Sequence, residues 1–251
     1  MIFLASALAA LLVMLAAFAV SLRTGVHAGV DIAWGLGFTA VAAACVAVTG
    51  HGWLIAGLTA IWGVRLAIHI GRRYTGEEDP RYAQMLDGRS TWHALRTVYL
   101  TQAVALWFVS LPVQVAALHG KVTWWSSFGL GLWAVGLVFE AVGDAQLARF
   151  RNDPASRGKV LDTGLWRYTR HPNYFGDACV WWGLFALACV HWTGWLTILS
   201  PLVMTYFLAG KTGKPLMEKH LSSTRPGYAD YVARTSAFIP RPPRPQGLPR
   251  S

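Results

Sequence analysis

The stretch GLWRYTRHPNYFGDACVWW, residues 164–182, joins a polar loop to an apolar run and shows in miniature how the chain is built. Pro172 disfavours helical backbone at His171 and suits the first position of a helix, so we expect a helix to begin near Asn173. Basic and aromatic side chains crowd the preceding loop. A loop that enters a helix N-terminus suits anions, because unpaired N–H groups and the helix dipole face it. The stretch predicts an anion-binding loop at a membrane surface.

Apolar runs of this kind recur along the chain. Of its 251 residues, 54% are hydrophobic and only 14% are charged, whereas a soluble domain is about a quarter charged. Thirteen tryptophans fit the aromatic belts of a membrane protein. Runs long enough to cross a bilayer lie at residues 2–22, 31–49, 53–71, 97–118, 124–148, 174–190 and 194–210. The composition predicts an all-α, polytopic membrane bundle of about seven transmembrane helices.

Neither the N-terminus nor the cysteines indicates a secreted protein. The run Ile2–Leu22 lacks a charged beginning and has the length of a span, so we expect a first transmembrane helix instead of a signal peptide. Cys45, Cys179 and Cys189 all fall in apolar runs, with no CxxC spacing. We expect them to be small core residues.

The distribution of Lys and Arg predicts the orientation. Basic residues gather in alternate connections and in the C-terminal segment, whereas the connections between them contain only Lys121. The positive-inside rule then requires an odd number of spans, with the N-terminus outside and the C-terminus in the cytoplasm. Seven spans satisfy the rule, and six do not. The net charge of +10 therefore reflects membrane orientation, and we expect no nucleic-acid partner.

The chain shows no internal repeat. We expect a single transmembrane catalytic domain over residues 1–240 and a Pro-rich, disordered tail over residues 241–251. The segment before the tail predicts a short amphipathic helix, a turn at Pro226-Gly227 and a second helix. Its polar residues either line a site with the loop at 149–173 or only pack on the bundle. The abundance of Ala, Gly and Arg suggests a bacterial inner membrane, and no obligatory protein partner is evident.

Four acidic residues lie within or at the ends of apolar runs: Asp31, Glu140, Asp144 and Asp177. A charge at membrane depth costs about 2.5–3.5 kcal/mol on insertion scales, so each is a functional candidate. The alternative is a paired structural charge near a helix end. Glu140 and Asp144 share one helical face, to which Arg151 returns if the helix persists. Acids followed by bases suit a ribose–pyrophosphate unit, although the same acids would also neutralise nearby arginines.

A second polar stripe follows the third apolar run, where Arg65, His69 and Arg72 are spaced for one helical face. This spacing favours an interior polar face. The eight histidines are otherwise scattered, and no HExxH pattern predicts a metal site. No GxGxxG motif or P-loop occurs, so any nucleotide site must be built from membrane helices.

Three segments together resemble the steroid 5α-reductase-related family of membrane proteins, the DUF1295 group. They are LARFRND at 147–153, GKVLDTGLWRYTRHPNYFGDACVWWG at 158–183 and RPGYADYVARTSAFIP at 225–240. More distantly, the chain resembles isoprenylcysteine carboxyl methyltransferases and sterol C14-reductases. The RHPNY core is shared with the methyltransferases, whereas the stretch DAQLARFR at 144–151, upstream of that core, is closer to the reductase pattern.

The resemblance implies NADPH-dependent reduction of the C=C bond of a conjugated, lipid-like enone, such as a 3-oxo-Δ4 steroid, in the membrane lipid. The cofactor-binding positions that it implies are Glu140, Asp144, Arg151, Arg170, His171, Asn173, Tyr174, Asp177, Glu218, His220, Tyr228 and Tyr231. It aligns Val30-Asp31 with the Gln-Glu pair of the steroid reductases and His69 with their Tyr, so Asp31 and His69 are the implied catalytic residues. The alternatives are an S-adenosylmethionine-dependent methyltransferase, acting on a lipid or isoprenylcysteine, and a non-catalytic lipid-binding or scaffold protein.

Overall fold

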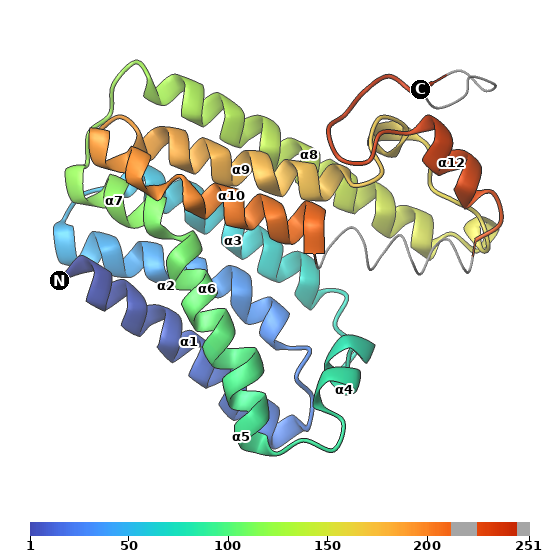
Figure 1. Ribbon diagram of the computed structural model, residues 1–251, viewed down its shortest axis with the longest axis horizontal. Coiled ribbons are helices and arrows are strands. Elements are labelled where there is room, and N and C mark those ends of the chain that lie inside the picture. Colours follow the sequence, from blue (N-terminus) through green and yellow to red (C-terminus); the bar gives the residue numbers. More distant parts are fainter. Residues whose placement is uncertain (212–224, 245–251) are drawn as a thin grey trace. The chain divides into compact units, whose positions relative to one another are not determined.

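The computed structural model describes residues 1–211 and 225–244, and within these ranges every regular element is a helix (Figure 1). The all-α prediction is confirmed. By their internal contacts the residues form two compact units. Unit 1 comprises residues 1–127 and 184–200, and unit 2 comprises residues 128–183 and 201–251.

Several helices have the length and composition of membrane spans. Five of them qualify as single segments: α1 (Ile2–Thr24), α2 (Val30–Thr49), α3 (Trp53–Gly71), α8 (Ser126–Asn152) and the run Trp192–Gly210. A bent pair, Thr91–Val109 and Leu111–His119, makes a sixth. The remaining predicted span corresponds to α9 (Pro172–Ala188), which has only 17 residues and is not among these candidates. The described residues thus give five or six candidate spans, where the sequence predicted about seven. The protein is therefore a multi-pass helical membrane bundle.

Unit 1 is built on α2, which packs between α1 and α3. Glycines allow α2 and α3 to approach closely, because a Cβ atom on Gly35 would lie 2.4 Å from the carbonyl oxygen of Gly63. Phe38 and Trp62 are fully buried beside this contact, with their ring centroids 5.4 Å apart. Small residues thus set the helix spacing and aromatic residues fill the remaining volume.

The predicted span at 97–118 is not one straight helix. It consists of α5 (Thr91–Ala94), a π-helical turn η1 (Leu95–Leu100), α6 (Thr101–Val109) and α7 (Leu111–His119), with a bend of 42° between α6 and α7. Pro112 has no N–H to donate and disfavours a continuous helix. The amide of Gln114 instead donates to the Trp107 carbonyl at 2.9 Å and accepts from the Ser6 hydroxyl at 2.8 Å. These side-chain bonds satisfy polar groups at the break.

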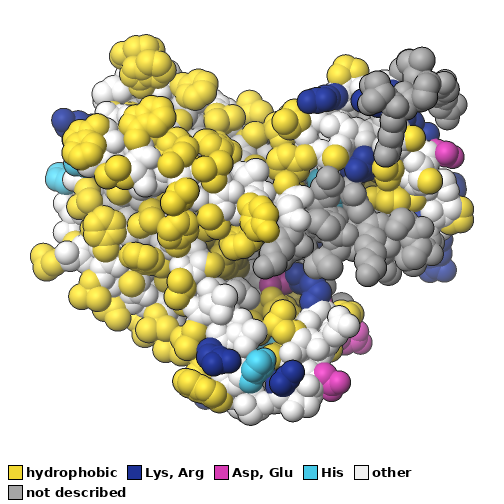
Figure 2. Space-filling model, in the orientation of Figure 1, with side chains coloured by type: hydrophobic (Ala, Val, Ile, Leu, Met, Phe, Trp, Pro, Cys, Tyr) yellow, Lys and Arg dark blue, Asp and Glu magenta, His cyan; other side chains and the backbone are white. Residues whose placement is uncertain are grey.

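The connection between the predicted spans at 53–71 and 97–118 contains structure of its own in unit 1. Asp79 caps the short helix α4 (Pro80–Leu86) by accepting from the Arg81 N–H at 2.8 Å. The Glu78 carboxylate accepts from the N–H groups of His27 and Ala28 at 2.7 and 2.9 Å, just before α2 begins. Figure 2 shows charged side chains gathered around α4 and α5, whereas the surface over the long helices is mostly hydrophobic. The loop is thus pinned to the start of α2.

Unit 2 pairs α8 with α9. A Cβ atom on Gly176 would lie 2.4 Å from the Glu140 backbone nitrogen, so the two helices meet almost backbone to backbone. As predicted, α9 begins beside Asn173, with Pro172 at its first position. The loop before it holds two short 3-10 turns, η2 (Pro154–Ser156) and η3 (Gly164–Arg167).

The remaining elements complete the two units. In the run Trp192–Gly210, the 3-10 segment η4 (Trp192–Thr197) precedes α10 (Leu199–Tyr206) and a π-helical turn, η5 (Phe207–Lys211). After the turn at Pro226-Gly227 comes α12 (Tyr228–Arg234), which confirms the second predicted C-terminal helix. The first predicted helix of that segment lies outside the described residues.

Candidate functional site

The RHPNY loop of unit 2 is tied to the C-terminal segment by buried hydrogen bonds. Arg170 is only 8% exposed, and its guanidinium donates to the Thr235 carbonyl at 2.7 Å and the Val232 carbonyl at 3.2 Å. Its backbone N–H donates to the Ser236 carbonyl at 2.9 Å. The Thr169 hydroxyl donates to the Phe238 carbonyl at 2.7 Å. Arg170, which the resemblance implied as a cofactor ligand, therefore holds the C-terminal segment at Val232 and Thr235.

A second set of bonds fastens this block to α8. The Tyr231 hydroxyl donates to the Trp166 carbonyl at 2.6 Å, and the Trp166 indole donates to the Gly143 carbonyl at 3.1 Å. Burial raises the pKa of Tyr231, so its phenol stays protonated and able to donate. Arg234 forms an ion pair with Asp162. These contacts fix the walls of a cavity.

The cavity has a volume of about 180 Å³ and is basic and aromatic. Its charged lining residues are all cationic: Arg151, Lys159, Arg170 and Arg225. Its aromatic lining residues are Phe150, Trp166, His171, Tyr174, Tyr228 and Tyr231. Among the described residues, no carboxylate lines it. A hollow with cations and no acid attracts an anion, and flat side chains suit a planar group beside it.

Seven of the twelve predicted cofactor positions line this cavity: Arg151, Arg170, His171, Asn173, Tyr174, Tyr228 and Tyr231. His171 and Tyr174 lie parallel, with an interplanar angle of 1° and ring centroids 5.4 Å apart. Glu218 and His220 fall outside the described residues. Lys159 and Arg225 were not singled out, although both lie in the segments that carry the family resemblance.

The predicted acids are buried but do not line the cavity. Glu140, Asp144 and Asp177 are 2%, 5% and 7% exposed. The side-chain amide of Asn173 donates to Asp144 at 3.1 Å, and its oxygen accepts from the Tyr174 N–H. Asp144 therefore orients Asn173, a residue that does line the cavity.

Unit 1 contains a separate polar cluster around Asp31, defined by Asp31, Asp79, Arg81 and Tyr82. Asp31 pairs with the Arg81 guanidinium at 2.8 Å and accepts from the Tyr82 hydroxyl at 2.6 Å. Tyr82 is 7% exposed, and the amide of Gln102 lies 3.4 Å from its oxygen. Burial, and then the charge of Asp31, raises the pKa of Tyr82. The phenol is thereby kept as a hydrogen-bond donor.

Arg81 links the Asp31 cluster to the cap of α4. Its guanidinium also bonds both carboxylate oxygens of Asp79, each at 2.9 Å. These hydrogen bonds lower the pKa of Asp79 and raise the pKa of Arg81, so the group remains charged. One guanidinium thus serves two carboxylates.

The other predicted catalytic residue, His69, is half-buried on α3. Its Nε2 atom lies 3.5 Å from the Arg73 guanidinium. The sequence did not single out Tyr82, although its loop visibly mixes acids, bases and aromatics. The phenol beside Asp31 is the kind of donor that the sequence had assigned to His69.

The family model described as "Protein of unknown function (DUF1295)" matches residues 17–235. An uncharacterized protein of Schizosaccharomyces pombe (strain 972 / ATCC 24843) is 26% identical over 220 residues. That match covers 75% of this chain and 63% of the relative, so the chain spans less than two thirds of the relative's length. No solved structure matches the chain.

Proposed function

The chain belongs to the DUF1295 family, and we propose that it is a membrane oxidoreductase that uses NADPH to reduce the C=C bond of a conjugated, lipid-like enone, in particular a 3-oxo-Δ4 steroid. The observation that carries the proposal is the cavity of unit 2. Among residues 1–211 and 225–244, cations and aromatic rings surround it and no carboxylate lines it. In the proposed orientation the cavity faces the cytoplasm.

The chemistry of this cavity fits the phosphate-bearing part of NADPH. Arg and Lys bind phosphate through charge-assisted hydrogen bonds. Lys159 and Arg225 form no ion pair within residues 1–211 and 225–244, so their charges are available to a ligand. A volume of about 180 Å³ suits one part of a dinucleotide, not its whole length. S-adenosylmethionine carries no phosphate, and the lining therefore favours NADPH over the methyltransferase alternative.

The lining residues divide into three roles under this proposal. Arg151, Lys159 and Arg225 hold phosphate oxygens. The parallel rings of His171 and Tyr174 offer flat surfaces to a planar group. Asn173, oriented by Asp144, supplies a directional polar contact. Arg170 contributes charge, while its guanidinium also holds the C-terminal backbone.

The Asp31 cluster suits the reducing step. NADPH, when bound, supplies the hydride that adds to the β-carbon of the enone, which places negative charge on the carbonyl oxygen. Tyr82 then donates its proton to that oxygen in a hydrogen bond, exchanging its present bond to Asp31. Asp31 orients the phenol, and Arg81 balances its charge. A proton must also reach the α-carbon, and His69 is the alternative donor to either atom.

Ligand binding to the detergent-purified chain tests the cofactor. We expect NADPH to bind, NADH to bind more weakly and S-adenosylmethionine to give no heat in titration calorimetry. Arg225→Ala should weaken NADPH binding by roughly tenfold through loss of one charge-assisted hydrogen bond. Added salt should reduce the difference in NADPH affinity between the wild type and this variant. Arg157→Ala is the matched control, since Arg157 is exposed and does not line the cavity. Equal effects of the two variants, or binding of S-adenosylmethionine instead, would remove NADPH from this site.

A further inference from the structure

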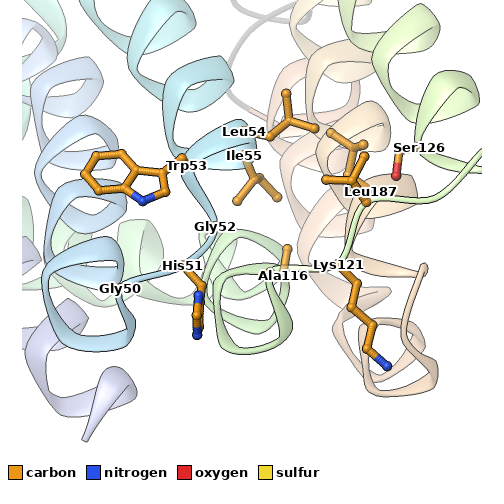
Figure 3. A pocket seen from close by; sticks show the side chains of 12 residues that line it. Gly50, His51, Gly52, Trp53, Leu54, Ile55, Ala116, Lys121, Ser126 and Leu187 are labelled. Atoms are coloured by element: carbon orange, nitrogen blue, oxygen red, sulfur yellow. The ribbon is translucent and has the colours of Figure 1, made fainter.

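Unit 1 has a cavity of its own at the end of α2 that is opposite Asp31 (Figure 3). Its volume is about 230 Å³. The walls come from the α2–α3 connection with the first turn of α3, from the stretch between the end of α7 and the first residue of α8, and from Leu187 in the last turn of α9. The 20 residues of α2 put roughly 30 Å between this cavity and Asp31. It is therefore separate from the Asp31 cluster.

The charge around this cavity is uncompensated. Lys121 and His51 line it, and the connections at this end, residues 49–52, 119–127 and 189–193, contain no Asp or Glu. In the part of the chain that the structure describes, Lys121 forms no ion pair. An anion that enters the cavity meets positive charge and no competing carboxylate.

Neutral donors add to this preference. Ser126 lines the cavity and is 5% exposed, and its oxygen accepts from the Thr123 N–H at 3.0 Å. Within the described residues its hydroxyl proton has no acceptor, so it is free to donate into the cavity. Gly52, which precedes α3, provides no side-chain cap, and the first-turn N–H groups of α3 remain without helical partners.

The backbone is shaped to bring the two basic residues together. Gly120 has a φ of +58°, and a Cβ atom there would lie 2.8 Å from the His51 Cβ atom. Only glycine permits this approach without displacement. It sets Lys121, the next residue, beside the wall that carries His51.

The opposite wall of the cavity is apolar. Figure 3 shows Leu54, Ile55 and Leu187 gathered on one side, while His51 and Lys121 project on the other. Trp53 on the rim is 72% exposed, and the nearby Trp124 and Trp125 are 74% and 58% exposed. Exposed tryptophans are typical of the depth at which a bilayer changes from headgroups to acyl chains. A hollow that is basic on one side and apolar on the other is matched to an amphiphile.

We propose that this cavity binds the headgroup of an anionic membrane phospholipid. The lipid phosphate accepts from the Lys121 ammonium, and an acyl chain lies against the apolar side formed by Leu54 and Ile55. The site does not depend on the proposed reductase function, because none of its residues belongs to the Asp31 cluster or to the cavity of unit 2.

Native mass spectrometry of the full chain, released from detergent with added lipid, tests the site. Phosphatidylglycerol should remain bound in preference to phosphatidylcholine. Lys121→Gln should lower its retention roughly fivefold, the effect of one basic residue near an anionic lipid. Lys121→Arg should retain it. Arg96→Gln, which removes one exposed charge elsewhere in unit 1, should have no effect. NADPH affinity should be the same in all four proteins.

Three results would overturn the proposal. The first is equal retention of the two lipids, and the second is equal loss of lipid in Lys121→Gln and Arg96→Gln. The third concerns the source of the phosphate. If millimolar inorganic phosphate displaces phosphatidylglycerol and raises the melting temperature as much as the lipid does, the site serves a soluble anion instead of a membrane lipid.

Discussion

The two polar sites on which the proposed reaction rests are organised in opposite ways. In unit 1, the Asp31 cluster satisfies itself: two carboxylates share one guanidinium, and a phenol donates to one of them. In unit 2, the charged residues that line the cavity in the described part of the chain all have the same sign. The charges of the Asp31 cluster are paired without a ligand, whereas the cations of the cavity in unit 2 attract an anionic ligand.

This difference indicates whether each site controls turnover or cofactor affinity. Removing one member of a closed cluster leaves its buried partners without a counterpart, which changes the chemistry available at that place. Removing a cavity cation that forms no ion pair with the described residues, such as Lys159 or Arg225, reduces repulsion among the others and weakens only ligand binding. We therefore expect turnover to depend most on the Asp31 cluster and cofactor affinity to depend most on the cavity of unit 2.

The largest effect should come from Tyr82→Phe. The variant keeps the buried ring but loses the donor to the developing oxyanion, and loss of one such donor lowers kcat by roughly a hundredfold or more. NADPH affinity should not change. The measurement is single-turnover oxidation of NADPH in the presence of a steroid enone. Tyr74→Phe, which alters an exposed tyrosine of the same loop region, is the control.

The same assay distinguishes Tyr82 from His69. If Tyr82→Phe retains at least half of the wild-type kcat while His69→Ala abolishes turnover, His69 is the donor and the Asp31 cluster only anchors α4. If Tyr82→Phe, His69→Ala and Asp31→Ala each keep full activity, these residues of unit 1 take no part in the reaction. The expected dependence of turnover on the Asp31 cluster would then be wrong.

A smaller effect is expected in unit 2 from Arg170→Ala. The substitution removes the donor to the buried carbonyls of Thr235 and Val232, and a hydrogen bond from a charged group contributes about 1.5–3 kcal/mol. The free energy of unfolding in mixed micelles should fall by that amount, and amide hydrogen exchange should rise in α12. Arg170→Lys should restore it only in part, because an ammonium lacks the planar fork of a guanidinium.

The matched control for Arg170 is Arg167→Ala, which removes an exposed charge from the same loop. If Arg170→Ala leaves stability and exchange unchanged but weakens NADPH, the residue acts only on the ligand. Ligand binding in the cavity of unit 2 would then not depend on the hydrogen bonds that hold the C-terminal segment.

Local signals in the sequence were sufficient for much of this fold. The start of α9 follows from Pro172, and the persistence of α8 to Asn152 keeps Arg151 helical. The contacts that define the sites were harder to predict from the sequence. Asp31 and Tyr82 are 51 positions apart, and their pairing depends on where α4 docks.

Backbone acceptors were the least predictable part of the sites. The partners of Arg170 are carbonyl oxygens, which every residue has, so no residue type marks them. The bend at Ser110 likewise rests on a glutamine reaching back to a carbonyl, which hydropathy does not register. Residue types predicted which groups would be polar and buried, and tertiary packing selected their partners.

The smallest expected effect is an alkaline loss of stability that both units share. Burial raises the pKa of Tyr82 in unit 1 and of Tyr231 in unit 2 above the value of about 10 for an unfolded tyrosine. Below pH 10 both tyrosines are protonated in both states, and their contribution is fully present. Above pH 10 the unfolded chain loses protons that the folded chain keeps, so stability falls as pH rises, by at most about 1.4 kcal/mol per pH unit for each tyrosine.

Removing one phenol at a time separates the two units by the slope of this alkaline loss. Between pH 10 and pH 11, Tyr82→Phe and Tyr231→Phe should each reduce the slope of the unfolding free energy against pH. The reduction should be at most about 1.4 kcal/mol per pH unit, the effect of one proton, whatever the stability of the variant at neutral pH. Tyr168→Phe, at an exposed position of unit 2, should leave the slope as in the wild type. A slope that responds to Tyr231 but not to Tyr82 would mean that the phenol beside Asp31 ionises as readily as in the unfolded chain. In that case water would reach the Asp31 cluster. The cluster would then not be the closed site that we contrast with the open cavity of unit 2.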